Sequence, residues 1–389
     1  DAVGGKSLSH AKELGVLDLV DASPHYVVDS IVFGSTNGSE VRVMLPKEAY
    51  ATKGLQSGYA LPRKQFDWLM FYRAQQIVRE HGGAVIQGFS VLEVTHQGEG
   101  GSAHITGVRC KAGGKRGNGP ELTFTSRVTI GAGGYNCPVA SAITKEIHNE
   151  PLRDDEHFCG GYREYWEDVE GLEGGEGPIE IHFIDEVLPG YFWLFPVRDG
   201  LVNVGIGMLI SEQRKQTGMK KSLKKIQEWV IKEHPRFSKR FANAKMLEGS
   251  AKGWQLPFGS PRKKTSRQPR RSSMNGIRLV GDAASLIDPF SGEGVGNALV
   301  TGEMAARHIT EKRPFLEYQD EVWKVLGPEL INSYRMQKLS RKSWLLNWFV
   351  GKAEKKPALQ EMMTEMIASK ETQQVLWNPW FLFKTIVLP

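Results

Sequence analysis

Residues 277–300, IRLVGDAASLIDPFSGEGVGNALV, constrain the fold more than any other stretch of the sequence. They open with a short apolar run, typical of a buried strand, which delivers the acidic side chain of Asp282 at its end. A turn rich in proline and glycine follows, and then a helical pattern. Because Gly292, Gly294 and Gly296 carry no side chains, a flat or anionic ligand can approach the backbone N–H groups at the helix start. The Asp282 carboxylate can accept hydrogen bonds from ligand hydroxyls, such as those of a ribose.

This segment resembles the second FAD-binding motif of a flavoprotein family that includes aromatic hydroxylases, flavin halogenases and geranylgeranyl reductases. The family form is a strand, then Gly-Asp-Ala-Ala, then Asp-Pro, then Gly-x-Gly-x-Gly-x-Asn, and nearly every position is present here. An ordinary strand–turn–helix does not account for Gly-Asp-Ala-Ala and three glycines together. The resemblance implies that FAD contacts Gly281, Asp282, Pro289, Gly292, Gly294, Val295, Gly296 and Asn297.

With 389 residues, of which 40% are hydrophobic and 24% charged, the chain can bury a large core and form two packed domains. The net charge of +6 mildly favours an anionic partner, although a solubilising surface produces the same charge. Cys110, Cys137 and Cys159 form no C-x-x-C pair, so they indicate neither a disulfide framework nor a zinc site and fit a reducing compartment. No apolar run approaches the roughly 18 residues of a transmembrane helix, and no signal peptide is recognisable. We expect a cytoplasmic protein.

The start of the chain lacks one half of a dinucleotide-binding site. The sequence begins at Asp1, and no Gly-x-Gly-x-x-Gly follows an N-terminal strand. Such a βαβ unit takes about 30 residues. Because the motif at 277–300 is intact, we expect the N-terminal piece of the FAD-binding domain to lie outside this sequence.

Several stretches before residue 150 match the same family. Residues 1–20 predict a loop entering a short helix, and a similar family stretch implies that Lys6 and His10 lie near the flavin; a solvated helix start is the alternative. The pattern Arg-x-x-Phe-Asp-x-x-Leu begins at Arg63, whose family counterpart contacts FAD, and a guanidinium suits pyrophosphate or ribityl oxygens. The resemblance also implies FAD contacts near Val91 and at Ala132.

The pattern around these candidates predicts the following elements. They are a hairpin over 26–46 that turns at 36–38, a helix from about 63 to 80, a strand pair over 84–95, a long loop over 97–120 and a strand over 122–130. A glycine-rich turn follows at 131–137, with Gly133 where the family usually has Asp.

Residues 157–210 predict an antiparallel sheet, because apolar residues alternate between turn signals. On a strand, Tyr191, Trp193 and Phe195 lie on one face and make a broad apolar surface. Together with Pro196 and the later Gly205-Ile206-Gly207, they resemble the Tyr-x-Trp-x-Phe-Pro … Gly-x-Gly motif of geranylgeranyl reductases. The resemblance implies that Tyr191, Trp193, Phe195, Gly205 and Gly207 bind the substrate.

The remaining sequence predicts helices. They cover 217–243, the stretch after the glycine motif to about 309, 315–326 and 328–350. A basic loop lies at 261–271. Tryptophan beside lysine in the apolar stretches 343–350 and 375–389 is typical of an interfacial membrane contact. The alternatives are packing against the protein body for the first stretch and lining of a lipid channel for the second.

We therefore predict an α/β protein with three parts. Residues 1–150 and 270–312 form a discontinuous, Rossmann-like FAD-binding domain that is incomplete at its N-terminus. Residues 151–269 form a substrate-binding domain on an antiparallel sheet, and residues 313–389 form a C-terminal helical region.

From residue 1 to about 310 the chain resembles the geranylgeranyl reductase family. The resemblance implies an FAD-dependent reductase that saturates C=C bonds of a polyprenyl chain on a lipid, chlorophyll precursor or quinone, with NADPH or ferredoxin as electron donor. An isolated alkene is poorly polarised, so proximity and a dry apolar cleft must supply most of the catalysis. The proton donor stays open among Lys6, His10, Tyr191 and bound water.

Two alternatives remain. A flavin-dependent monooxygenase or halogenase would use the same scaffold, since halogenases carry a Trp-x-Trp-x-Ile-Pro pattern close to residues 191–196; their catalytic lysine has no convincing counterpart here. A non-catalytic protein could use the basic loop and the C-terminal aromatic residues on nucleic acid or membrane, which the intact FAD motif disfavours. We expect no nucleic-acid partner and a peripheral contact with the membrane surface.

Overall fold

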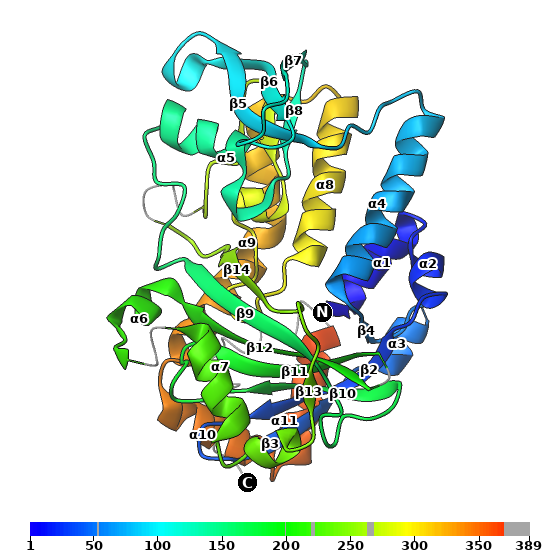
Figure 1. The fold of residues 1–389 in the computed structure, drawn as a ribbon, viewed down its shortest axis with the longest axis vertical. Coiled ribbons are helices and arrows are strands. Elements are labelled where there is room, and N and C mark those ends of the chain that lie inside the picture. The colour runs from blue at the N-terminus through cyan, green and yellow to red at the C-terminus, as the bar shows by residue number, and fades with distance from the viewer. Residues whose placement is uncertain (53, 199, 219–221, 263–267, 369–389) are drawn as a thin grey trace. The chain divides into compact units, whose positions relative to one another are not determined.

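The computed structural model describes residues 1–52, 54–198, 200–218, 222–262 and 268–368 (Figure 1). The chain divides into two compact units. Unit 1 comprises Asp1–Arg73, Cys159–Gln255 and the described chain from Arg335 onward, and unit 2 comprises Ala74–Phe158 and Leu256–Tyr334. These boundaries differ from the predicted ones, because the strands of the first 73 residues pair within the sheet of unit 1.

Unit 1 is built on one mixed sheet with the strand order β1-β4-β2-β10-β11-β12-β9-β13, in which β3 also pairs with β2 and β14 with β9. The bounds are β1 (Ala2–Gly4), β2 (Tyr26–Gly34), β3 (Glu40–Met44), β4 (Gly58–Ala60), β9 (Phe158–Glu167), β10 (Glu176–His182), β11 (Tyr191–Arg198), β12 (Leu201–Leu209), β13 (Lys245–Met246) and β14 (Lys252–Pro257). The predicted hairpin over 26–46 is confirmed by the antiparallel pairing of β2 with β3. The antiparallel sheet over 157–210 is confirmed by the pairing of β10, β11, β12 and β9 in that order.

Helix α7 (Leu223–Lys232) covers one face of β11 and β12. Phe192 and Leu194 of β11 are fully buried and belong to the same apolar cluster as Ile226 and Val230 of α7. The helix is shorter than the one predicted over 217–243, because the Ser222 side chain caps its start and the chain leaves helical geometry before Pro235.

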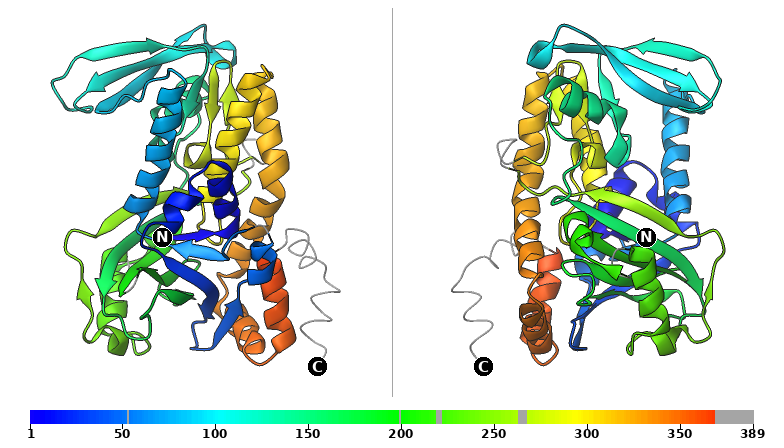
Figure 2. Two further views of the ribbon diagram at one scale, coloured as in Figure 1. Left: turned by 90° about the vertical axis from the view of Figure 1, so that its right-hand side faces the viewer. Right: turned by 60° about the vertical axis from the view of Figure 1, so that its left-hand side comes forward.

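The other helices of unit 1 are α1 (Gly5–Glu13), α2 (Leu17–Asp21), α3 (Lys47–Ala51), the start of α4 (Arg63–Glu80), α6 (Ile210–Lys215), α10 (Ser343–Ala353) and α11 (Pro357–Ala368). Val350 of α10 and Leu359 of α11 pack with Val41 and Val43 of β3, so both helices lie against this strand (Figure 2). Part of the stretch 343–350 therefore packs on the protein body. The stretch 375–389 lies outside the described residues.

Unit 2 contains two three-stranded sheets, with strand orders β15-β16-β8 and β5-β6-β7. Their bounds are β5 (Phe89–Gln97), β6 (His104–Ala112), β7 (Glu121–Thr125), β8 (Thr129–Gly131), β15 (Ser273–Met274) and β16 (Ile277–Leu279). The predicted loop over 97–120 is wrong, since it contains β6, which pairs on both sides with other strands. The single strand predicted over 122–130 is also wrong, since β7 and β8 belong to different sheets.

The helices of unit 2 are the end of α4, α5 (Pro138–Ser141), α8 (Val295–Thr310) and most of α9 (Phe315–Leu339). Helix α8 confirms the predicted helix after the glycine motif. The break predicted between 326 and 328 is wrong, because α9 continues through Pro328 with Leu326 and Leu330 both buried in the core of unit 2. No helix in the described ranges is long and apolar enough to cross a membrane.

Candidate functional site

The Gly-Asp-Ala-Ala segment is a tight turn held against α8. After β16, residues Gly281–Ala284 form a 3-10 turn, and Gly281 takes a left-handed φ of +53°. A Cβ atom at position 281 would lie 2.8 Å from the Ala298 Cβ, so only glycine lets the turn approach the helix this closely. The Gly281 N–H donates to Thr301 Oγ1 at 3.0 Å, which ties the turn to the second turn of α8.

Asp282 and the start of α8 lie together, as the sequence predicts. A Cβ atom on Gly294 would be 3.2 Å from Asp282 Oδ1, so the carboxylate lies beside the residue that precedes the helix. Gly294 is the N-cap of α8, and no side chain caps the helix. The first backbone N–H groups of α8 and the positive end of its dipole are therefore suited to an anionic or electron-rich ligand.

The loop between the turn and α8 is held by its own polar groups. Asn297 is buried and donates from Nδ2 to the Leu286 carbonyl at 2.7 Å, so its side chain positions this loop. Asp288 Oδ1 accepts from the N–H groups of Phe290 (2.9 Å) and Ser291 (2.8 Å). Burial raises the pKa of Asp288, although these hydrogen bonds oppose it. Within this loop, Pro289 is buried, and Gly292 has a φ of +75° that favours glycine.

Arg270 is a positioning residue that the sequence analysis missed. Its Nη1 donates to the Ala283 carbonyl at 2.7 Å, and its Nη2 donates to the Leu152 carbonyl. The side chain is only 3% exposed, and burial lowers its pKa to about 9. No local pattern marks this arginine among the basic residues of 261–271, because its partners are distant in sequence.

The other predicted FAD contacts lie in three places. Ala132 directly follows β8, which runs parallel to β16 with Gly131 opposite Leu279, so Ala132 and Gly281 lie at the same end of this sheet. Val91 lies in β5 of the other sheet of unit 2, opposite Cys110. Arg63 begins α4 in unit 1, and its exposed Nε donates to Asp67 Oδ1 at 2.6 Å.

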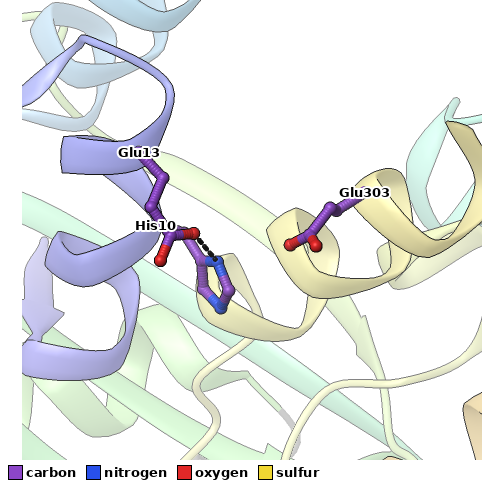
Figure 3. Close-up of side chains that lie close together, drawn as sticks. All are labelled: His10, Glu13 and Glu303. Carbon is purple, nitrogen blue, oxygen red and sulfur yellow. Dashed lines mark hydrogen bonds and ion pairs between the residues drawn. The ribbon is translucent and has the colours of Figure 1, made fainter. Parts of the chain in front are cut away.

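Lys6 and His10 lie on α1 in unit 1. His10 Nδ1 is 3.2 Å from Glu13 Oε2, one helical turn further along (Figure 3). The His10 side chain is 21% exposed. This i,i+3 pair keeps the imidazole beside a carboxylate, an arrangement that suits proton exchange.

The predicted aromatic row on β11 is present. Tyr191, Trp193 and Phe195 are all half-buried, whereas Phe192 and Leu194 between them are fully buried on the side of α7. The ring centroids of Tyr191 and Trp193 are 5.9 Å apart, and those of Trp193 and Phe195 are 6.1 Å apart. The three rings form a continuous apolar surface on the face of the sheet away from α7.

A glycine of β12 makes room for the central ring of this row. Gly205 is opposite Trp193 in the sheet, and a Cβ atom at 205 would overlap ring carbons Cε2 and Cζ2 of the indole. The indole therefore rests on the backbone of β12. Its Nε1 donates to Asn203 Oδ1 at 3.1 Å. Gly207 lies opposite Tyr191. A Cβ atom at position 207 would make only an ordinary van der Waals contact with the Trp193 ring.

Strand β9 extends this face with two residues that the sequence analysis missed. Arg163 is opposite Gly205, and Tyr165 is opposite Asn203. The Arg163 guanidinium carbon lies 4.3 Å from the Tyr165 ring centroid, and its Nη1 donates to the Ser250 carbonyl at 2.6 Å. The Arg163 guanidinium thus places a positive charge beside the apolar surface of the aromatic row. The alternation of apolar and polar residues over 157–169 is the sequence signal that could have placed both residues on one face of a strand.

Comparisons with known proteins bear on this arrangement. The family model described as the geranylgeranyl reductase catalytic domain matches residues 162–248, which contain the aromatic row and the glycines beneath it. The predicted resemblance to geranylgeranyl reductases is therefore confirmed for this part of the chain. The predicted motif at Tyr191–Gly207 lies within the matched range.

Relatives with similar sequences match between half and three quarters of the chain. Digeranylgeranylglycerophospholipid reductase of Methanosarcina acetivorans is 28% identical over 297 residues, which are 75% of this chain and 62% of the relative. Its counterpart in Thermoplasma acidophilum is 30% identical over 198 residues, 50% of this chain and 43% of the relative. The chain therefore spans less than two thirds of the length of these relatives.

Solved structures share the fold. A geranylgeranyl bacteriochlorophyll reductase-like protein of Thermoplasma acidophilum superposes with a TM-score of 0.62 at 16% identity, covering 98% of this chain and 95% of that chain. The flavin-dependent brominase Bmp2 superposes with a TM-score of 0.65 at 16% identity, covering 98% of this chain and 88% of its own. The predicted α/β flavoprotein fold is confirmed.

Proposed function

We propose that the protein is an FAD-dependent reductase that saturates C=C bonds in a polyprenyl chain. The aromatic row of β11, with the Trp193 indole resting on Gly205, carries the proposal. A broad apolar surface suits a flexible isoprenoid, which offers no polar group for recognition along its length. The names of the relatives favour a phospholipid as the carrier of this chain, ahead of a chlorophyll precursor or a quinone.

The residues of unit 2 fit FAD. The uncapped start of α8 and the half-buried Asp282 beside it combine an N–H donor cluster with a hydroxyl acceptor. The residues proposed to hold FAD are Gly281, Asp282, Pro289, Gly292, Gly294, Val295, Gly296 and Asn297, with Ala132, Val91 and Arg63. In its reduced form FAD supplies the hydride.

The protein's own part in the reaction is positioning and exclusion of water. Tyr191, Trp193 and Phe195 would hold the polyprenyl chain in a dry environment, where an unactivated double bond reacts through proximity. The proton is proposed to come from Lys6, His10, Tyr191 or bound water. NADPH or reduced ferredoxin is proposed as the electron donor.

Lipid analysis tests the function. We expect cells that contain the protein to accumulate polyprenyl lipids heavier by one hydrogen molecule per saturated bond than lipids of cells without it, measured by mass spectrometry. A matched strain expressing a Trp193→Ala variant is expected to keep the unsaturated lipids. Identical lipid masses in all strains, with FAD-loaded protein present, would contradict the proposal.

The alternative is a monooxygenase or halogenase, whose fold the brominase structures share. Oxygen separates the two reactions. The reductase is expected to consume reductant in the absence of O₂ in proportion to the bonds saturated. Reductant consumption that requires O₂ and yields a hydroxylated or halogenated product would establish the alternative.

A lipid-borne substrate also implies a meeting with a membrane. We propose a peripheral contact, in which the protein stays outside the bilayer and reaches its substrate from the surface.

A further inference from the structure

Helix α10 exposes two tryptophans although it packs against unit 1. Val350 and Ala353 are buried in the apolar cluster with β3, whereas Trp344 is 65% exposed and Trp348 is 39% exposed. Burying such side chains is strongly favourable in water, so two neighbouring indoles left in solvent on one helix indicate a surface that meets another apolar phase.

The orientation of α10 is set by a polar clamp. Asn347 Oδ1 accepts hydrogen bonds from Thr36 Oγ1 at 3.1 Å and from the Asn37 N–H at 3.2 Å. This clamp joins the middle of the helix to the turn between β2 and β3. The tryptophans are therefore held on the outer side of a fixed helix, and their exposure does not depend on a freely rotating segment.

Positive charge flanks the two indoles. Trp344, Trp348 and Lys352 follow one another at i, i+4 and i+8, so they form one row along the helix. Lys342 is the N-cap residue of α10, and both lysines are exposed. A row of two indoles bounded by ammonium groups matches the layers of a bilayer surface, where indoles lie at the headgroup level and lysines reach anionic phosphates.

We propose that this surface, formed by Trp344, Trp348, Lys342 and Lys352 and here called the α10 face, binds the surface of an anionic phospholipid bilayer. The contact is interfacial, because α10 (Ser343–Ala353) is too short to span a bilayer. A second copy of the chain fits less well, since a two-fold contact through this row would bring like-charged lysines of the two copies together.

The α10 face deepens the proposed function, because it names where the protein meets a lipid phase. The α10 face depends on the proposed function only for the reason why the protein would bind a membrane. Its test needs no catalytic activity, so failure of one proposal leaves the other standing.

Co-sedimentation with vesicles tests the α10 face on the whole 389-residue chain. Wild-type protein is expected to bind vesicles of mixed phosphatidylcholine and phosphatidylglycerol, and to bind pure phosphatidylcholine vesicles less. The double variant Trp344→Ala/Trp348→Ala is expected to lose about tenfold or more in partitioning, because two interfacial anchors are removed. The matched control is Trp68→Ala on α4, which removes an indole that is 58% exposed elsewhere in unit 1.

A charge variant separates the two parts of the surface. Lys342→Glu/Lys352→Glu is expected to weaken binding to the anionic vesicles by about tenfold or more and to reduce the salt dependence of that binding. Its partitioning into neutral vesicles is expected to stay unchanged. Wild-type protein that does not sediment with anionic vesicles would overturn the proposal. The proposal would also be overturned if the tryptophan double variant bound vesicles like wild type. It would likewise be overturned if wild type were a dimer in analytical ultracentrifugation and the double variant a monomer.

Discussion

The indole ring of Trp193 rests on the backbone of Gly205, so close that a Cβ atom at position 205 would overlap the ring. Any side chain there must push the indole out of the aromatic row. The glycine thus acts by making room for an aromatic residue on the neighbouring strand. This relationship gives the sharpest test of the substrate surface.

We expect Gly205→Ala to destabilise unit 1 by about 1–3 kcal/mol through overpacking, and to lower activity by about tenfold to a hundredfold by displacing the indole. Gly207→Ala is the matched control, because a Cβ atom there would be 3.7 Å from the Trp193 ring and 3.4 Å from Cys159 Sγ, within ordinary contact. Adding Trp193→Phe to Gly205→Ala is expected to restore stability, since the smaller ring leaves space. Equal effects of the two alanine variants in thermal unfolding and product formation would refute the steric account.

The turn at Gly281 depends on the Thr301 hydroxyl. Thr301 is fully buried, and its Oγ1 is the acceptor for the Gly281 N–H at 3.0 Å. Thr301→Val leaves this N–H without its acceptor and is expected to cost about 1–3 kcal/mol of stability and to weaken FAD binding. Thr301→Ser keeps the acceptor and serves as the control. Flavin fluorescence titration and chemical unfolding measure both effects, and a valine variant that binds FAD like the serine variant would count against this role.

Asp282 is expected to bind FAD directly. Asp282→Ala should weaken FAD binding by about tenfold to a hundredfold, the worth of one hydrogen bond to a charged acceptor, while the unfolding midpoint without FAD stays close to that of wild type. Asp288→Ala should lower the unfolding midpoint without FAD and change FAD affinity less, because Asp288 holds the loop through the N–H groups of Phe290 and Ser291. If isothermal titration with FAD shows the same affinity for Asp282→Ala and wild type, the carboxylate has no part in the site.

Acid sensitivity of unit 1 is expected to centre on Glu180. This buried carboxylate receives two hydrogen bonds from Arg240, at 2.7 and 2.9 Å, and one contact with His182 Nε2 at 2.7 Å. Burial would raise the pKa of Glu180, but the hydrogen bonds from His182 and Arg240 outweigh it and lower the pKa from 4.5 to about 2. A lowered folded-state pKa means that the charged form stabilises the fold.

That stabilisation is complete above the ordinary pKa of 4.5 and is lost as the pH falls from there toward 2. Glu180→Gln is expected to destabilise unit 1 by about 3–5 kcal/mol at neutral pH, because the half-buried Arg240 loses its charged partner. It is also expected to flatten this acid limb, because the titrating carboxylate is gone. Glu176→Gln, on the same strand, removes an exposed pair with Lys47 and should leave stability close to that of wild type. Unfolding midpoints measured from neutral to acid pH check both. A steep acid limb that persists in Glu180→Gln would place the sensitive group elsewhere.

Local patterns predicted much of the site. Alternation along β11 placed Tyr191, Trp193 and Phe195 on one face, because successive side chains of a strand point to opposite sides. The glycines and Asp282 likewise predicted a turn and a helix start, since these need particular backbone conformations and leave particular groups free. Arg163, Asn203 and Arg270 escaped prediction, because their partners come from other strands or loops.

The same limit explains the errors in the fold. The glycine-rich, polar sequence around β6 predicts a loop, because the pairing that β5 and β7 provide leaves no local pattern. Helix α9 continues through Pro328 because buried leucines on both sides outweigh the local preference for a break.

By itself, the sequence determined the hairpin over 26–46, the FAD-type motif and the composition of the aromatic row, because each depends on neighbours a few residues apart. Only the tertiary structure decided that the first 73 residues join the sheet of unit 1, that Trp193 rests on Gly205, and that Trp344 and Trp348 face outward on α10. These depend on which distant strands pair and which helix face finds a partner. That choice is made by burial and hydrogen bonding across the whole fold, and no local pattern records it.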